Sequence, residues 1–213
     1  ASAALASYFG CGPDLIYLPE TDFDMDKFLN DVTSCYKEKG NCLVAVSEGC
    51  HYADGTFVSE AKTSGTDGFG HAQLGGLAAK LADALKRRFN TKVRGIELSL
   101  LQRCGAHLAS KTDVDEAFNA GKTAVENAVS GVTGKMVAFK RVYENGAYKC
   151  ETELLPLDCV ANAEKKFPAE WINAEGNGIT EDFYAYALPL IQGEPERKTE
   201  NGLPRFARLK KTL

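Results

Sequence analysis

The segment DLIYLPETDFDMDKFLNDVTSCYKEKGNCLVAVSEG, residues 14–49, contains two short apolar runs separated by an amphipathic stretch. The first run covers residues 14–20 and reaches a proline near its end, and the second covers residues 41–49. Residues 25–40 between them place their apolar side chains on one helical face, and Gly40 is suited to end that helix. The order strand, helix, strand is typical of a parallel sheet with flanking helices, so we predict an α/β fold.

The same alternation continues toward residue 130. We expect a helix over residues 77–89 and a third, apolar and buried strand over residues 92–101. A long helix follows, and the Ser-Lys-Thr-Asp motif at residues 110–113 is suited to interrupt it and to cap a new helical start.

The chain changes character after Gly131. Two β-type runs flank Asn145-Gly146, and Asn-Gly between alternating apolar residues predicts a β-hairpin. A last helix is expected near residues 180–191, followed by a polar tail. The predicted fold class is therefore α/β, a parallel sheet with flanking helices plus a C-terminal β-hairpin and helix, in one compact unit.

Composition excludes several classes of protein. The 213 residues carry a formal net charge of −4, which argues against a nucleic-acid-binding surface. No run approaches the roughly 20 apolar residues of a membrane span. The seven cysteines include no Cys-x-x-Cys pair and no histidine at metal-binding spacing. We expect reduced thiols in a cytoplasmic protein, and no metal ligands in this chain.

Charged side chains follow the predicted strands, where ligands of parallel α/β sheets usually bind. Glu48 comes directly after the second apolar run, and a carboxylate there is suited to accept hydrogen bonds from sugar hydroxyls. A helix cap or a surface salt bridge is the structural alternative for Glu48.

Two arginines stand nine positions apart around the third predicted strand. Arg103 lies where that strand gives way to a helix N-terminus, and the two together favour an anion such as a phosphate. Arg94, at the other end of the segment, would contribute a second guanidinium to the same phosphate. The alternative for Arg94 is a surface arginine beside Lys92 with no ligand. The residues therefore predict a phosphate-binding pair.

A glycine-rich stretch, residues 66–76, is a weaker candidate for a phosphate-binding loop. It lacks the Lys-Ser/Thr ending of a Walker loop and does not fit the dinucleotide-binding pattern. His71 within it is suited to acid–base work near neutral pH, or simply to organising its turn.

Five ordered blocks carry a resemblance that covers nearly the whole chain. They are DLIYLPE, LVAVSEG, GFGHAQLGG, RGIELSLLQR followed by HLASKTDVDEA, and GITEDFYAYALPLIQGE. Together they resemble the 6-phosphofructokinase family, and most closely its pyrophosphate-dependent branch.

The resemblance implies a role for each candidate. Glu48 corresponds to the ligand of the hydroxyls of fructose 6-phosphate, and Arg103 to the residue that binds its 6-phosphate. Arg94 matches a second phosphate-binding arginine, which in oligomeric members reaches a neighbouring subunit. Leu100 stands where many pyrophosphate-dependent relatives have tyrosine, so no hydroxyl contact is expected there.

The resemblance also implies what this chain lacks. The family's phosphoryl-donor loop, its catalytic base and its magnesium ligands would all precede Ala1, so no catalytic residue is expected here. We expect the C-terminal, sugar-phosphate-binding portion of a phosphofructokinase, inactive alone. The absence of an initiating methionine favours truncation.

For the complete enzyme, the resemblance implies magnesium, pyrophosphate as donor and a homodimer or homotetramer. The alternatives are an ATP-dependent 6-phosphofructokinase and a non-catalytic, sugar-phosphate-binding regulatory subunit.

Overall fold

The computed structural model describes residues 12–59, 76–98 and 104–205. The chain divides into two compact units, in contrast to the single unit predicted from the sequence. The first unit comprises residues 1–98 and 166–184, and the second comprises residues 99–165 and 185–213. The reason is that the chain returns to the first unit after the hairpin, so that each unit is assembled from two separate segments.

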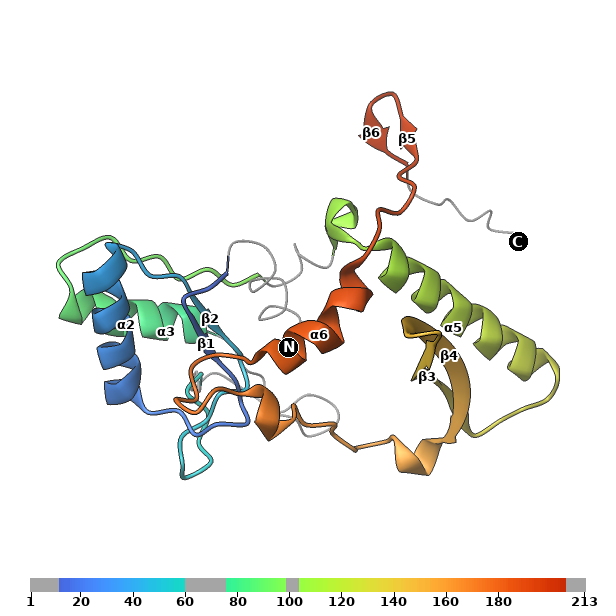
Figure 1. Cartoon of the computed structure of the whole chain (residues 1–213), viewed down its shortest axis with the longest axis horizontal. Helices are drawn as coiled ribbons and strands as arrows, with labels where there is room; N and C mark the ends of the chain where they lie inside the picture. Colours follow the sequence, from blue (N-terminus) through green and yellow to red (C-terminus); the bar gives the residue numbers. More distant parts are fainter. Residues whose placement is uncertain (1–11, 60–75, 99–103, 206–213) are drawn as a thin grey trace, which may run out of the picture. The chain divides into compact units, whose positions relative to one another are not determined.

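The first unit is built on the predicted strand–helix–strand segment. Strands β1 (Leu15–Tyr17) and β2 (Val44–Val46) pair in parallel, with Ile16 opposite Ala45, and α2 (Met25–Lys39) connects them (Figure 1). The expected parallel pair and its connecting helix are therefore confirmed.

Helix α2 has a defined cap at each end. The Asp24 side chain accepts a hydrogen bond from the backbone N–H of Lys27 at 2.7 Å, which satisfies one of the free donors of the first turn. The chain leaves the helix through Gly40, whose φ of 74° is a left-handed conformation that glycine adopts at no steric cost. The predicted C-cap is confirmed.

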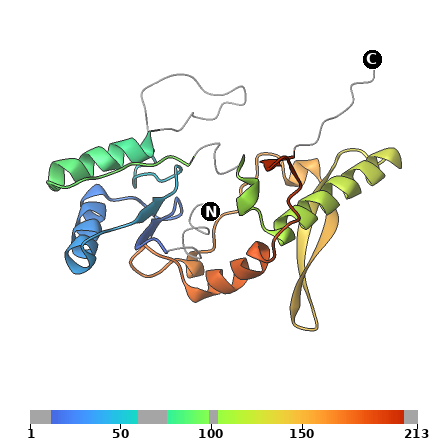
Figure 2. The ribbon, with the colours of Figure 1, turned by 90° about the horizontal axis from the view of Figure 1, so that it is seen from above.

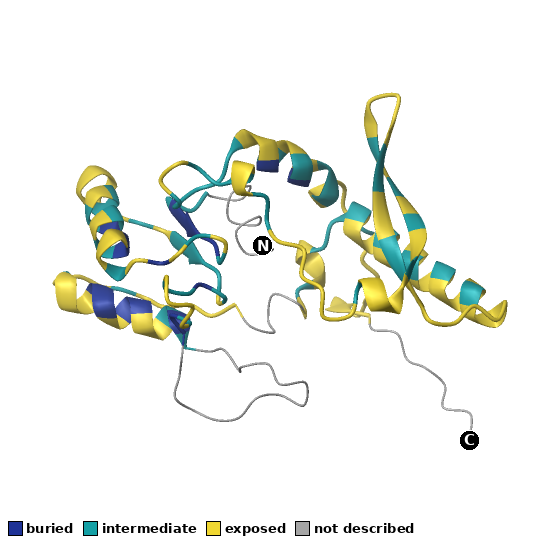
Figure 3. Ribbon diagram, turned by 90° about the horizontal axis from the view of Figure 1, so that it is seen from below, coloured by how far each residue is buried: buried dark blue, intermediate teal, exposed yellow. Residues whose placement is uncertain are grey.

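The core of the first unit lies between the sheet and two helices. Tyr17, Phe23 and Phe28 form an aromatic cluster with ring centroids 5.4–5.6 Å apart. Helix α3 (Leu77–Arg88) adds Leu81 and other apolar side chains to it, and these buried positions are the dark segments of α2, α3 and β1 in Figure 3. Burial of this amphipathic face, rather than helix propensity alone, holds α3 in place.

The other face of β1 is covered by the returning segment. Ile16 and Leu18 pack against Phe167 and Ile179, and the Ile16 N–H donates to the carbonyl of Asn177 at 2.8 Å. This segment contains the short helix η3 (Ala169–Trp171).

The last predicted helix corresponds to α6 (Glu181–Ala187) followed by η4 (Leu188–Ile191). Its position near residues 180–191 is confirmed.

The third predicted strand is not formed in the part of it that the structure describes. Residues 92–98 are extended but unpaired with β1 or β2, and Ile96 is 72% exposed. The segment instead runs beside the start of α3, where the Glu97 carboxylate accepts a hydrogen bond from the Gly76 N–H at 3.0 Å. Contacts with the α3 N-terminus therefore replace strand pairing in residues 92–98. The rest of the predicted strand, residues 99–101, lies outside the described residues.

The second unit joins a long helix to a β-hairpin. A short helix, η1 (Ala106–Leu108), precedes α5 (Lys111–Val129), and the Ser110 hydroxyl accepts from the Asp113 N–H at 3.1 Å. The predicted interruption and new helical start are therefore confirmed. Helix α5 lies against the hairpin, as Figures 1 and 2 both show, and Tyr148 donates to Glu116 across this contact at 2.8 Å.

Strands β3 (Lys135–Glu144) and β4 (Ala147–Pro156) form the predicted hairpin in full antiparallel register. Asn145 and Gly146 make the turn with φ values of 51° and 79°, the two left-handed residues of a type I′ turn. The helix η2 (Leu157–Cys159) follows.

A second, shorter hairpin was not predicted. It pairs β5 (Thr199–Glu200) with β6 (Leu203–Pro204) around Asn201-Gly202, in the segment expected to be a polar tail. The same Asn-Gly signal was present in the sequence. Within the described ranges, the structure offers no helix with the length and apolar character needed to cross a membrane.

Candidate functional site

The carboxyl ends of β1 and β2 form one edge of the parallel pair, and each strand ends in a tight turn. After β1 the Thr21 N–H donates to the carbonyl of Leu18 at 3.3 Å. After β2 the Cys50 N–H donates to the carbonyl of Ser47 at 3.1 Å. Glu48 is the first central residue of this second turn, which places it at the rim of the sheet.

Glu20 and Glu48 both lie at this edge, and the structure distinguishes them. Glu20 accepts a hydrogen bond from the backbone N–H of Phe167 at 2.9 Å, so it holds the returning segment against the sheet. Glu48 is exposed, and no hydrogen bond or ion pair joins its carboxylate to another described residue. Its own carbonyl accepts from the Ser59 hydroxyl at 3.3 Å, which fixes the backbone of the turn. Glu48, unlike Glu20, is therefore suited to an external ligand.

The residue that closes this turn, Cys50, is buried and unreactive. Cys50 is fully buried, and its thiol donates weakly to the carbonyl of Tyr17 at 3.6 Å. Burial raises the pKa of the Cys50 thiol to about 12, so it stays protonated and is a poor nucleophile. Cys50 supports the Glu48 turn by packing, not by chemistry.

Arg94 lies on the extended segment beside α3 and is exposed. It makes no ion pair with another described residue, so its guanidinium is open to an anion. The neighbouring Gly95 approaches α3 so closely that a Cβ atom would meet the carbonyl oxygen of Ala78 at 2.5 Å. This close approach fixes the backbone next to Arg94. No contact between Arg94 and Glu48 is described, and each remains a predicted substrate ligand.

Two predicted site residues lie outside the described residues. Arg103 and His71 both fall in ranges about which the structure says nothing, and so does the glycine-rich stretch 66–76 except for Gly76. Their roles stay predictions from the sequence.

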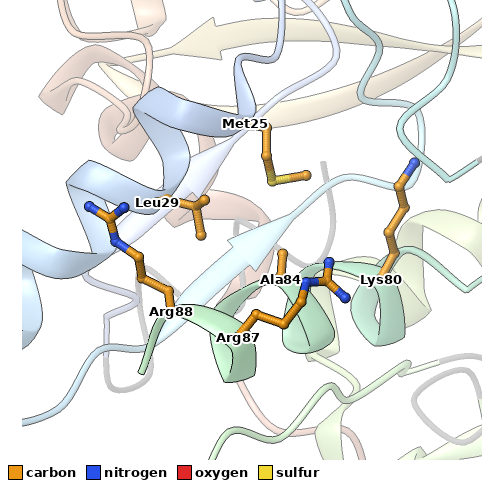
Figure 4. A pocket seen from close by; sticks show the side chains of 6 residues that line it. All are labelled: Met25, Leu29, Lys80, Ala84, Arg87 and Arg88. Carbon is orange, nitrogen blue, oxygen red and sulfur yellow. The ribbon is translucent and has the colours of Figure 1, made fainter. Parts of the chain in front are cut away.

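A pocket of about 290 Å³ lies between α2 and α3. Met25, Leu29 and Ala84 supply its apolar lining, and three basic side chains surround it (Figure 4). These are Lys80, Arg87 and Arg88. None of the predicted site residues lines this pocket, so it is not the predicted sugar-phosphate site.

The described residues do not offer a magnesium site. Among them, one group of three side chains has metal-ligand atoms close together, and it consists of Asp14, Cys35 and Cys42. Magnesium prefers oxygen ligands, and two thiols do not fit it. Sequence reasoning did not find this group, because its members come from separate elements and follow no familiar spacing.

Comparison with known proteins gives three results. The family model described as Phosphofructokinase matches residues 2–128. A pyrophosphate--fructose 6-phosphate 1-phosphotransferase from Halomonas elongata is 44% identical to the chain, over 99% of the chain and 50% of the relative. The enzyme of the same name from Methylococcus capsulatus is 42% identical over 92% of the chain and 46% of the relative.

A solved structure agrees with these sequence matches. The pyrophosphate-dependent phosphofructokinase from Nitrosospira multiformis matches with a TM-score of 0.73 and 35% identity, over 93% of the chain and 47% of that structure. The chain thus spans about half the length of the relatives it matches.

Proposed function

Since the chain belongs to the phosphofructokinase family, we propose that the complete protein transfers a phosphoryl group from pyrophosphate to the 1-hydroxyl of fructose 6-phosphate. The product is fructose 1,6-bisphosphate, an intermediate of glycolysis. The names of the Halomonas and Methylococcus relatives, both more than 40% identical, support pyrophosphate as the donor. The proposal includes a cytoplasmic location.

In this proposal the chain supplies the sugar-phosphate side of the active site. The observation that carries it is the position of Glu48, an exposed carboxylate in the turn after β2 that no described residue engages. Carboxylates accept hydrogen bonds from sugar hydroxyls, and each such charge-assisted bond contributes about 1.5–3 kcal/mol. Glu48 therefore orients the sugar so that its 1-hydroxyl faces the donor.

The arginines serve the other end of the sugar phosphate. Arg94 and Arg103 together provide two planar guanidinium groups, each able to hold a phosphate through two parallel hydrogen bonds. Phosphoryl transfer depends largely on positioning and on charge stabilisation, so ligands that fix the acceptor contribute directly to the rate.

The chain is not proposed to contain the catalytic base or the donor site. Magnesium, when bound to the complete enzyme, would neutralise charge on the transferring phosphates. Its ligands would come mainly from the preceding part of the protein. The chain alone is therefore expected to be inactive.

We also propose that the complete protein is a homodimer or homotetramer. Apolar side chains of α5 remain exposed in this chain, including Phe118 at 74% and Val129 at 84% exposed. Such a surface favours association. Sedimentation equilibrium of the complete enzyme measures the subunit number directly, and a monomer at all concentrations would exclude the oligomer.

The test of the proposed function is the change Glu48→Gln in the complete enzyme. Loss of the charge weakens the sugar contact by at least about 1.4 kcal/mol, so KM for fructose 6-phosphate is expected to rise about tenfold or more. KM for pyrophosphate should stay constant, because the donor ligands lie elsewhere. Glu38→Gln, which removes an exposed carboxylate near the end of α2, is the matched control.

Three results would count against the proposal. An unchanged KM for the sugar phosphate in the Glu48→Gln enzyme would remove Glu48 from the site. Activity with ATP but not with pyrophosphate would identify the ATP-dependent alternative. Sugar-phosphate binding by the complete protein without turnover with either donor would support the regulatory alternative.

A further inference from the structure

Three side chains with metal-ligand atoms converge at the opposite edge of the parallel pair from Glu48. Asp14 directly precedes β1, Cys42 lies just before β2, and Cys35 lies near the end of α2. Their carboxylate oxygen and sulfur atoms lie within 4.8 Å of one another, and all three residues are half-buried. The group is thus separate from the proposed sugar-phosphate site and does not depend on the proposed function.

We propose that Asp14, Cys35 and Cys42 form a binding site for a thiophilic divalent cation of the zinc class. Zinc binds thiolate sulfur at about 2.3 Å and carboxylate oxygen at about 2.0–2.2 Å. Ligand atoms around a tetrahedral zinc ion therefore stand about 3.4–3.8 Å apart. The present separations, all within 4.8 Å, exceed that spacing by about 1 Å at most.

The surroundings of Asp14 hold its carboxylate in position. One oxygen accepts a hydrogen bond from the Leu43 N–H at 2.7 Å, and the other accepts one from the Lys39 ammonium at 2.6 Å. Hydrogen bonds of this kind orient a ligand and fix which lone pairs remain for the metal. Each carboxylate oxygen keeps a further lone pair.

The charges of the site balance when a divalent cation is bound. Two thiolates and one carboxylate carry three negative charges, and the cation with Lys39 supplies three positive charges. A fourth ligand is available from water or from the Asn41 carbonyl, which accepts from the Cys35 thiol at 3.7 Å.

The ligand chemistry selects the class of metal. Two sulfur ligands favour zinc, cobalt or cadmium over magnesium or calcium. Bound metal would join the end of α2 to the starts of both strands, so it would stabilise the first unit by RT ln(1 + [M]/Kd), where [M] is the free metal concentration.

Cobalt(II) titration of the reduced chain tests the proposal, because thiolate ligation gives a charge-transfer band in the near ultraviolet and tetrahedral ligation gives strong visible bands. One equivalent of Co²⁺ is expected to produce both, and Zn²⁺ should displace it. Cys42→Ser and Cys35→Ser should each weaken metal binding more than about 100-fold. Mutation of a residue that only hydrogen-bonds to a metal ligand already lowers metal affinity about 10–100-fold, and these variants lose a ligand itself. Cys159→Ser, at an exposed thiol remote in sequence from the site, is the matched control and should bind normally.

Folding of each variant is followed by far-ultraviolet circular dichroism, and Cys35→Ala provides a second variant if a serine variant fails to fold. Absence of the thiolate band in the folded, reduced wild-type chain would overturn the proposal. So would an unchanged band in folded Cys35 variants.

Discussion

Replacement of Asp31 by alanine is expected to destabilise the first unit by about 2–4 kcal/mol. One carboxylate oxygen of Asp31 accepts hydrogen bonds from the Tyr17 hydroxyl at 2.9 Å, from the Asn177 side-chain amide at 2.9 Å and from the Lys27 ammonium at 2.6 Å. It therefore links β1 and α2 to the segment that returns after the hairpin.

The magnitude follows from the exposure of each partner. Lys27 is largely exposed, so this ion pair contributes only about 0.3–0.5 kcal/mol. Tyr17 is 6% exposed. Removing the Asp31 carboxylate would therefore leave the Tyr17 hydroxyl buried without its acceptor, which costs about 1–3 kcal/mol of stability. The Asn177 side-chain amide is part-buried, so water replaces some of the hydrogen bonding that it loses in the Asp31→Ala variant.

Urea unfolding followed by the fluorescence of Trp171, which lies in the returning segment, measures the change in unfolding free energy. Glu38→Ala removes an exposed carboxylate from the same helix and should change stability by less than about 0.5 kcal/mol. If Asp31→Ala also lowered the unfolding free energy by less than about 0.5 kcal/mol, the reasoning would be refuted. The three hydrogen bonds of Asp31 would then contribute no more than the contacts of a surface residue.

The same network predicts a pH dependence. Burial alone would raise the pKa of Asp31, but the hydrogen bonds from Lys27, Asn177 and Tyr17 outweigh it and lower that pKa below its ordinary 3.8. Because the folded-state pKa is depressed, the stabilisation is complete above about pH 4 and is lost as pH falls through the folded value. The stability difference between wild type and Asp31→Asn should therefore narrow in acid, and a constant difference would contradict this account.

Three further substitutions test the packing of the two units by thermal unfolding. Gly95→Ala would bring a Cβ atom to 2.5 Å from the Ala78 carbonyl oxygen and should destabilise the first unit by about 1–3 kcal/mol; unchanged stability would contradict the close approach. Gly121→Ala meets open space within α5 and should instead stabilise by about 0.5–1 kcal/mol. Arg141→Lys loses a guanidinium stacked 4.0 Å from the Tyr186 ring and hydrogen-bonded to the Tyr186 carbonyl at 2.9 Å, and should cost about 1–2 kcal/mol; no loss would contradict that contact.

Elements with strong local signals could be predicted from the sequence. The α2 cap at Gly40, the cap at Ser110 and the turn at Asn145-Gly146 each depend on a few neighbouring residues, and all three are confirmed. The apolar runs that became β1 and β2 were equally clear, because strands of a parallel sheet covered by helices have continuous apolar sequences; β1 is buried throughout and β2 is partly buried.

Features that depend on distant contacts could not be predicted. Residues 92–98 have the composition of a strand, but pairing depends on where the rest of the chain places the segment, and here Gly95 and Glu97 lie against the start of α3 instead. The division into two units also depends on a distant contact, the return of residues 166–184 to β1. No local pattern marks that return.

The candidate site shows the same contrast. Glu48 could be placed at a strand end from the sequence, because the carboxyl ends of parallel strands meet at one edge. The contact between Glu20 and the Phe167 backbone, which distinguishes Glu20 from the exposed Glu48, could not be predicted from the sequence. The convergence of Asp14 with two cysteines likewise depends on the fold.

Calorimetric titration of this chain with fructose 6-phosphate, and separately with pyrophosphate and ATP, tests the central claim most directly. The account predicts weak binding of fructose 6-phosphate that Glu48→Gln or Arg103→Lys reduces about tenfold or more, and hardly any binding of either donor. Tight binding of pyrophosphate or ATP by this chain, without binding of the sugar phosphate, would contradict the proposal that it supplies the sugar-phosphate side of the active site.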